Sequence, residues 1–262
     1  MCVIVTYLVI NILDIVWLGR GDERKVKTLS YVALPVAILV HSVTAWIFGL
    51  EIAKEGWYSA IMAPIFVASA CDSGLALLMV VLAAVRKAGV FDCGSALFAD
   101  LARLLAVFIA VDAFFVGCEL LTVAYPGAEG ATQLLSIMTS GSTAPFFWFE
   151  ILGGLLVPFL LLASAKRRKH AGVVVAASVL VMCGVLCKRV WLLFSSFAMT
   201  NVYGAPGISS GSTVARGADG FDMWAIVGSY TPQPVEFAVV AAVVAFCILG
   251  IALLSKKLVA KE

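Results

Sequence analysis

Seven long apolar segments constrain this chain more than any other feature of its sequence. Each is close to the ~20 residues that a helix needs to cross the ~30 Å hydrocarbon core of a bilayer. Backbone that faces lipid must satisfy its own hydrogen bonds, and these segments are too long and too uniformly apolar for barrel strands. The sequence therefore predicts an all-α, polytopic transmembrane helical bundle. The expected spans are residues 1–18, 30–53, 60–85, 101–124, 146–165, 171–198 and 235–255.

The overall composition agrees with a membrane protein. Hydrophobic residues make up 63% of the 262 residues, charged residues 13%, and the mean hydropathy is +1.07, which excludes an ordinary soluble domain. Nothing resembles a soluble domain, a tandem repeat or a long linker, so we expect residues 1–262 to form a single transmembrane domain. The first span begins at Met1 without a charged n-region, unlike a signal peptide. We expect a truncated N-terminus, a lipid membrane as partner, and no nucleic acid.

The basic residues predict the orientation. Most of the 18 Lys and Arg lie in the connections at 19–29, 86–100 and 166–170, at the start of the fourth span, and in the C-terminal tail. The connections at 125–145 and 199–234 are long and nearly free of them. The positive-inside rule then places the C-terminus in the cytoplasm and both long connections outside. We expect a multi-pass protein of the cytoplasmic (inner) membrane.

Cysteines and histidines argue against a resident redox centre. The seven cysteines include no CxxC pair, whereas an iron–sulfur cluster needs four clustered thiolates. Of the two histidines, His41 lies inside a span and His170 in a basic connection, so a bis-histidine haem between helices is not available. The sequence predicts no haem, no iron–sulfur cluster and no metal site. If the chain handles electrons, it must use an exchangeable carrier.

Ionisable residues inside the spans are the candidate functional groups. An isolated charge at a helix centre costs about 2.5 to 3.5 kcal/mol even on lenient insertion scales, so such groups are expected to face the bundle interior and to pair. Their depths are uneven, with few in the inner half apart from Asp14. Near mid-depth lie His41, Asp72 and Asp112, and in the outer part lie Glu119, Glu150, Lys188, Arg189 and Glu236.

Two interpretations of these charges stay open. Lys188 and Arg189 could form salt bridges with Glu119 or Glu150 that hold helices together, or they could contact a ligand. The collection of charges towards one leaflet favours a site for a polar head group whose tail stays in lipid. Trp46 lies near the same surface, either as part of the interfacial aromatic belt or stacked on a ring.

Several segments match a known family. The strongest are PVAILVHSVTAWIFGLE, GWYSAIMAPIFVASA and VDAFFVGCELLTVAY, followed by FFWFEILGGLLVPFLLL, GVLCKRVWLL and residues 230–236. With these segments the chain resembles the NrfD/PsrC (polysulfide reductase) family of integral membrane subunits over nearly its whole length. Family members usually have eight to ten spans, and a Trp and an Asp commonly precede a segment like VIVTYLVIN, where this sequence begins. An acidic residue that several relatives carry shortly after His41 is absent here.

The resemblance implies a role in respiratory electron transfer. Such subunits carry no redox centre of their own and bind quinol, such as menaquinol, as an exchangeable substrate near the outer face. A ferredoxin-like iron–sulfur subunit docks there and passes electrons to a catalytic molybdoenzyme or multihaem subunit. The expected function is therefore a membrane anchor that exchanges electrons between the quinone/quinol pool and an extracytoplasmic iron–sulfur partner.

Oxidation of a quinol releases two protons, so the site needs hydrogen-bond acceptors and a base. We expect His41 and Glu119 to fill these roles, Arg189 or Lys188 to stabilise a quinolate, and Asp72 and Asp112 to provide a proton path. The expected quinone-binding set is His41, Trp46, Glu119, Tyr125, Lys188 and Arg189.

Two other functions use the same residues. An ion or solute transporter could use the buried charges, although the sequence has no convincing pair of repeated or interrupted helices. A seven-helix retinal protein would need an intramembrane lysine, but Lys188 lies in the sixth span beside Arg189 rather than in the last.

Overall fold

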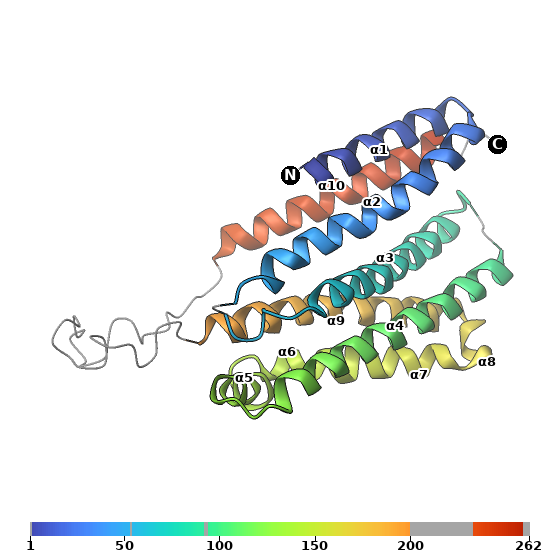
Figure 1. Ribbon diagram of the computed structural model, residues 1–262. Coiled ribbons are helices and arrows are strands. Elements are labelled where there is room, and N and C mark those ends of the chain that lie inside the picture. The colour runs from blue at the N-terminus through green and yellow to red at the C-terminus, as the bar shows by residue number, and fades with distance from the viewer. Residues whose placement is uncertain (1, 53, 92–93, 200–232, 259–262) are drawn as a thin grey trace.

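The computed structural model describes residues 2–52, 54–91, 94–199 and 233–258, and regular structure within them is helical throughout. These residues include seven helices that are long and apolar enough to cross a membrane. The predicted fold class is thereby confirmed (Figure 1). The spans are α1 (Cys2–Gly19), α2 (Glu23–Gly49), α3 (Met62–Lys87), α4 (Ser95–Ala124), the fifth span Ala144–Ala163, α9 (Ala171–Phe197) and α10 (Pro234–Leu258).

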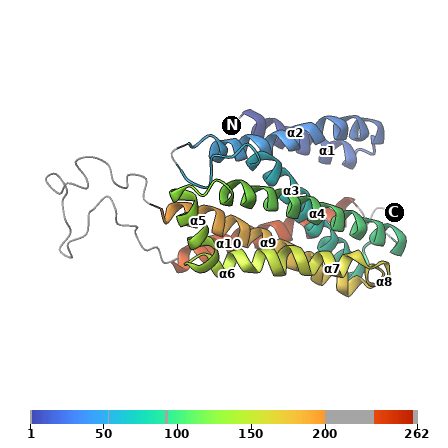
Figure 2. The same ribbon diagram turned by 60° about the horizontal axis from the view of Figure 1, so that its bottom comes forward.

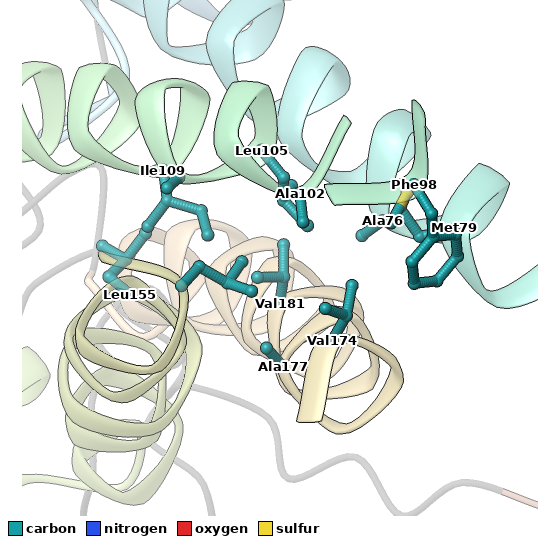
Figure 3. Close-up of a cluster of buried hydrophobic side chains, with 12 residues drawn as sticks. Ala76, Met79, Phe98, Ala102, Leu105, Ile109, Leu155, Val174, Ala177 and Val181 are labelled. Atoms are coloured by element: carbon teal, nitrogen blue, oxygen red, sulfur yellow. The ribbon is translucent and has the colours of Figure 1, made fainter. Parts of the chain in front are cut away.

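The core lies between α3, α4, α9 and the fifth span, which pack against one another. Its side chains are mostly small or branched, such as Ala102, Ala177 and Val181, and they meet where the helices cross (Figure 3). Small residues let helices approach closely where no hydrophobic effect drives them together in lipid. Helix α1 packs on α2, and α2 packs on α3. Helix α10 has no buried side chain among its described residues.

The connections separate by charge between the two ends of the bundle. The turn between α1 and α2, the connection between α3 and α4, and the short helix α8 (Ala165–Arg168) lie at one end, and α5 (Glu129–Ser140) lies at the other (Figures 1 and 2). Basic residues of the predicted inner side gather at the first of these ends, in the turn after α1, the start of α2, the end of α3 and α8: Arg20, Arg24, Lys25, Lys27, Arg86, Lys87, Lys166, Arg167 and Arg168. Successive antiparallel spans therefore place their connections at alternate ends of the bundle, as the distribution of basic residues predicted.

Most of the long connection at 125–145 is helical, because α5 occupies Glu129–Ser140. Leu134 and Met138 of this helix are buried and pack with Phe147 and Trp191 over the end of the bundle. The other long connection, 199–234, lies almost entirely outside the described residues, as do Arg216 and residues 230–232.

The fifth span is not a uniform α-helix. It consists of α6 (Ala144–Trp148), a π-helical segment η1 (Phe149–Leu156) and α7 (Val157–Ala163). Pro158 has no N–H to donate to the carbonyl of Gly154, and its ring clashes with that carbonyl in a regular α-helix. The wider π-helical turn relieves this clash, and such turns are frequent at functional sites.

Candidate functional site

Lys188 is the centre of a buried ion cluster. Its Nζ lies 2.5 Å from Asp112 Oδ2 of α4 and 3.1 Å from Glu150 Oε1 of η1. All three side chains are at most 2% exposed. The indole N–H of Trp191, one turn further along α9, donates to Glu150 Oε2. One lysine therefore links three elements of the bundle through two carboxylates.

Asp72 of α3 is a third carboxyl beside this cluster. It is fully buried and lies next to Asp112, and neither of its oxygens has a hydrogen-bond partner among the described residues. The hydroxyl of Ser69, one turn away on α3, is also buried without a partner there. Three carboxylates and one ammonium would carry a net charge of −2, which a dry interior tolerates poorly. Charge balance therefore favours protons held within the cluster.

A close approach of two helices positions the lysine and Glu150. A Cβ atom added to Gly154 of η1 would lie 2.5 Å from Gly184 Cα of α9, so only glycines fit at this crossing. Glu150 and Lys188 each lie four residues from these glycines, towards the same end of the bundle. The close approach therefore brings their side chains to the same level.

Glu119 lies two turns from Asp112 along α4, or about 10 Å. It is 8% exposed, and the Ser59 hydroxyl donates to its Oε2 at 2.6 Å. No described cation forms an ion pair with it. It lines a small internal cavity of about 30 Å³ together with Lys188, Trp191 and Phe66. This volume has room for about two water molecules, and it connects Glu119 with the ion cluster.

Arg189 and His41 lie apart from this cavity. The Arg189 guanidinium stacks on the ring of Phe66, with Cζ 3.7 Å from the ring centroid, and forms no ion pair with a carboxylate among the described residues. His41 lies within electrostatic range of Arg189. It is exposed on α2 and has no hydrogen bond to any described residue. Because Phe66 lines the cavity and also contacts Arg189, its ring lies between Arg189 and the cavity.

The two candidate aromatic residues lie on the surface. Trp46 is 48% exposed on α2, and Tyr125 is 92% exposed just after α4, as expected for an interfacial belt. Trp57, by contrast, is buried and donates from Nε1 to the Leu192 carbonyl at 3.0 Å. It fastens the connection between α2 and α3 to α9.

Sequence reasoning missed several members of this site. The salt bridge between Lys188 and Glu150 was one of the two alternatives that the sequence left open, and the structure contains it, with Glu150 only 1% exposed. Ser59, Phe66 and Trp191 were not singled out. A signal for Glu150 existed, because Gly153 and Gly154 followed by Pro158 indicate a distorted, closely packed helix. No group of His, Cys, Asp and Glu in the described part of the chain is arranged to hold a metal ion.

Comparison with known proteins gives three curated relatives. A Halobacterium salinarum protein, provisionally named as a membrane subunit of dimethyl sulfoxide reductase, is 36% identical over 86% of this chain and 52% of its own length. A selenate reductase subunit of Mesobacillus selenatarsenatis is 29% identical over 66% of this chain and 39% of its own. The Hdr-like menaquinol oxidoreductase integral membrane subunit of Archaeoglobus fulgidus is 26% identical over 85% and 55%. The chain spans about half the length of these relatives or less.

The sequence pattern of the family described as polysulphide reductase, NrfD, matches residues 3–201. This range contains the first six spans and every residue of the ion cluster and the cavity. The resemblance inferred from the sequence is confirmed, and this multi-pass membrane protein belongs to the NrfD polysulphide reductase family.

Proposed function

We propose that this chain is the membrane anchor subunit of a respiratory oxidoreductase complex, and that it exchanges electrons between the membrane quinone/quinol pool and an iron–sulfur partner subunit. The proposal rests on a set of buried proton-binding groups in a member of this family. The set consists of Asp72, Asp112, Glu150 and Lys188, and it adjoins a cavity that Glu119 also lines. The menaquinol oxidoreductase subunit among the relatives supports menaquinol as the substrate.

The cavity of about 30 Å³ is too small for a quinol ring. We therefore place the ring on the outer part of the bundle where His41 is exposed and Arg189 stacks on Phe66. In this arrangement His41 accepts a hydrogen bond from one quinol hydroxyl, and Arg189 stabilises the quinolate. Trp46 and Tyr125 lie on the surface through which the substrate and its tail would enter. Lys188 belongs to the proton-conducting part rather than to the ring contacts.

The proton route begins at Glu119. Oxidation of the quinol sends two electrons to the partner's iron–sulfur centre and releases two protons. His41 accepts one of them at the ring, and Glu119, on the cavity side of Phe66, is the proposed acceptor of the other. The cavity has room for water that would carry the proton from Glu119 to Lys188 at the edge of the ion cluster. The path continues towards the middle of the bundle through Asp112, which pairs with Lys188. It then reaches Asp72, and neither oxygen of Asp72 has a hydrogen-bond partner among the described residues.

Charge and topology support the placement of the partner. The basic end of the bundle would face the cytoplasm of the inner membrane by the positive-inside rule. The opposite end, with α5 and the connection at 199–234, would then receive an extracytoplasmic ferredoxin-like iron–sulfur subunit. That subunit would pass electrons to a catalytic molybdoenzyme or multihaem subunit.

The test compares membranes that contain the partner subunits with and without this chain. With the chain, a menaquinol analogue should reduce the iron–sulfur partner. Without the chain, an artificial donor should still reduce the partner, but the analogue should not. Equal rates of quinol oxidation in both membranes would contradict the proposed function.

A further inference from the structure

An apolar groove on an exposed side of α4 ends at two arginines. The groove runs between α4 and α7, has a volume of about 420 Å³, and is lined by Val107, Phe114 and Phe159, with Arg103 and Arg168 at its polar end. A second groove of about 500 Å³, lined entirely by apolar residues and glycine, shares Phe159 and Ala110 with the first. Together they form a continuous apolar surface.

Arg103 is in an unusual position for a charged residue. It lies eight residues inside α4, about 12 Å from the start of the helix, and it is exposed. It has no hydrogen bond or ion pair with a described residue. An arginine on a membrane helix without a carboxylate partner is costly unless its guanidinium reaches the head-group region or an anion.

Arg168 is held beside the same groove. Its Nη1 donates to the Leu162 carbonyl at 2.9 Å, which fixes the guanidinium near the end of α7. A guanidinium has five N–H donors in a planar fork that suits a phosphate, and the remaining donors have no carboxylate partner among the described residues. Helix α8, which carries Arg168, contacts α4, which carries Arg103 (Figure 2).

We propose that Arg103 and Arg168 bind the phosphate of an anionic phospholipid whose acyl chain lies in the groove. Charge complementarity selects this occupant, because two cations adjoin a surface that otherwise accepts only hydrocarbon. The groove follows α4 from Arg103 to Leu120, about 25 Å, which exceeds the ~15 Å of one leaflet. Basic pockets between helices at the cytoplasmic side commonly bind anionic head groups.

The experiment measures immobilisation of spin-labelled phosphatidylglycerol and phosphatidylcholine on the full chain in nanodiscs. Wild type should immobilise phosphatidylglycerol preferentially. Arg103→Gln should weaken that binding about fivefold, and the double variant with Arg168→Gln about 25-fold. The matched control removes the same two charges with Lys166→Gln and Lys169→Gln, which lie at the same end of the bundle outside the groove, and should leave the preference unchanged.

A second variant tests the hydrocarbon part while both arginines remain. Ala110 is exposed in the groove, so Ala110→Trp should fill the groove without disturbing the core and should displace the lipid. Three results would overturn the proposal. They are equal immobilisation of the two lipids on wild type, an equal loss in the lysine control, and displacement by soluble glycerol 3-phosphate with no effect of Ala110→Trp.

Discussion

At the scale of single residues, the ion cluster stabilises the bundle only when it is complete. Burying an ion pair gives little net free energy, but removing one partner leaves an uncompensated buried charge. Lys188 faces two carboxylates, Asp112 and Glu150, on two different elements. Its loss therefore affects α4, η1 and α9 together.

Lys188→Met should destabilise the protein by about 3 to 5 kcal/mol, because it leaves Asp112 and Glu150 buried without a cation. Asp112→Asn should cost less, because Lys188 keeps Glu150 at 3.1 Å. Thermal unfolding of the purified protein and its abundance in the membrane measure both effects. Lys169→Met, at an exposed position, is the control. An unfolding temperature for Lys188→Met equal to that of wild type would contradict this account of the cluster.

Asp72→Asn separates a functional from a structural role of the third carboxyl. Asp72 has no hydrogen-bond partner among the described residues, so its neutralisation should leave stability unchanged or improved. If Asp72 passes protons, quinol turnover should fall in the same variant. Unfolding temperature and quinol oxidation are measured side by side, with Asp100→Asn as the exposed control. Unchanged turnover would remove Asp72 from the proton path.

At the scale of elements, the π-helical segment and the glycine contact determine where the functional side chains lie. The apolar segments predicted all seven spans, because hydropathy and length alone decide whether a helix can cross a bilayer. Helices α2 and α4 begin seven and six residues before the predicted starts, at charged or polar residues that hydropathy does not count, and the other ends agree to within four residues. The irregular geometry inside the fifth span follows from contacts with α9 and from Pro158. Hydropathy carries no information about such contacts.

Gly184→Ala tests the importance of this close approach. The added Cβ would collide with Gly154 Cα, so α9 and η1 must move apart at a cost of about 1 to 3 kcal/mol. Gly172→Ala on the same helix is the matched control, because its Cβ would meet no atom within 4 Å. Differential scanning calorimetry of the two variants compares their unfolding temperatures. Equal unfolding temperatures would show that the helices are not held at this contact.

The candidate site was predictable in part from the sequence. Intramembrane ionisable residues are costly and therefore informative, and this indicated Asp72, Asp112, Glu119 and Lys188 as buried groups. The salt bridge of Lys188 with Glu150 was among the alternatives from the sequence, but its pairing with Asp112 was not, because it joins residues that are 76 positions apart. The exposure of His41 was also unexpected, since one helix sequence does not specify which face packs against a neighbour.

At the scale of the whole molecule, the distribution of charge predicts how the bundle sits in the membrane. The basic connections share one end, and α5 lies at the other (Figure 1). In a background without native cysteines, Tyr125→Cys should react with a membrane-impermeant maleimide added from outside, and Lys169→Cys should react only after permeabilisation. The opposite pattern would reverse the topology and the proposed side of partner docking.

We propose that this bundle oxidises quinol through His41 and Glu119. The most direct measurement is quinol-dependent electron transfer in the assembled complex carrying His41→Ala or Glu119→Gln, compared with transfer from an artificial donor to the partner. Each variant removes a proton acceptor, so quinol turnover should fall about 100-fold or more, with artificial-donor activity and abundance unchanged. His170→Ala and Glu23→Gln, both outside the site, should match wild type. Normal assembly of both site variants together with wild-type quinol turnover would contradict the account.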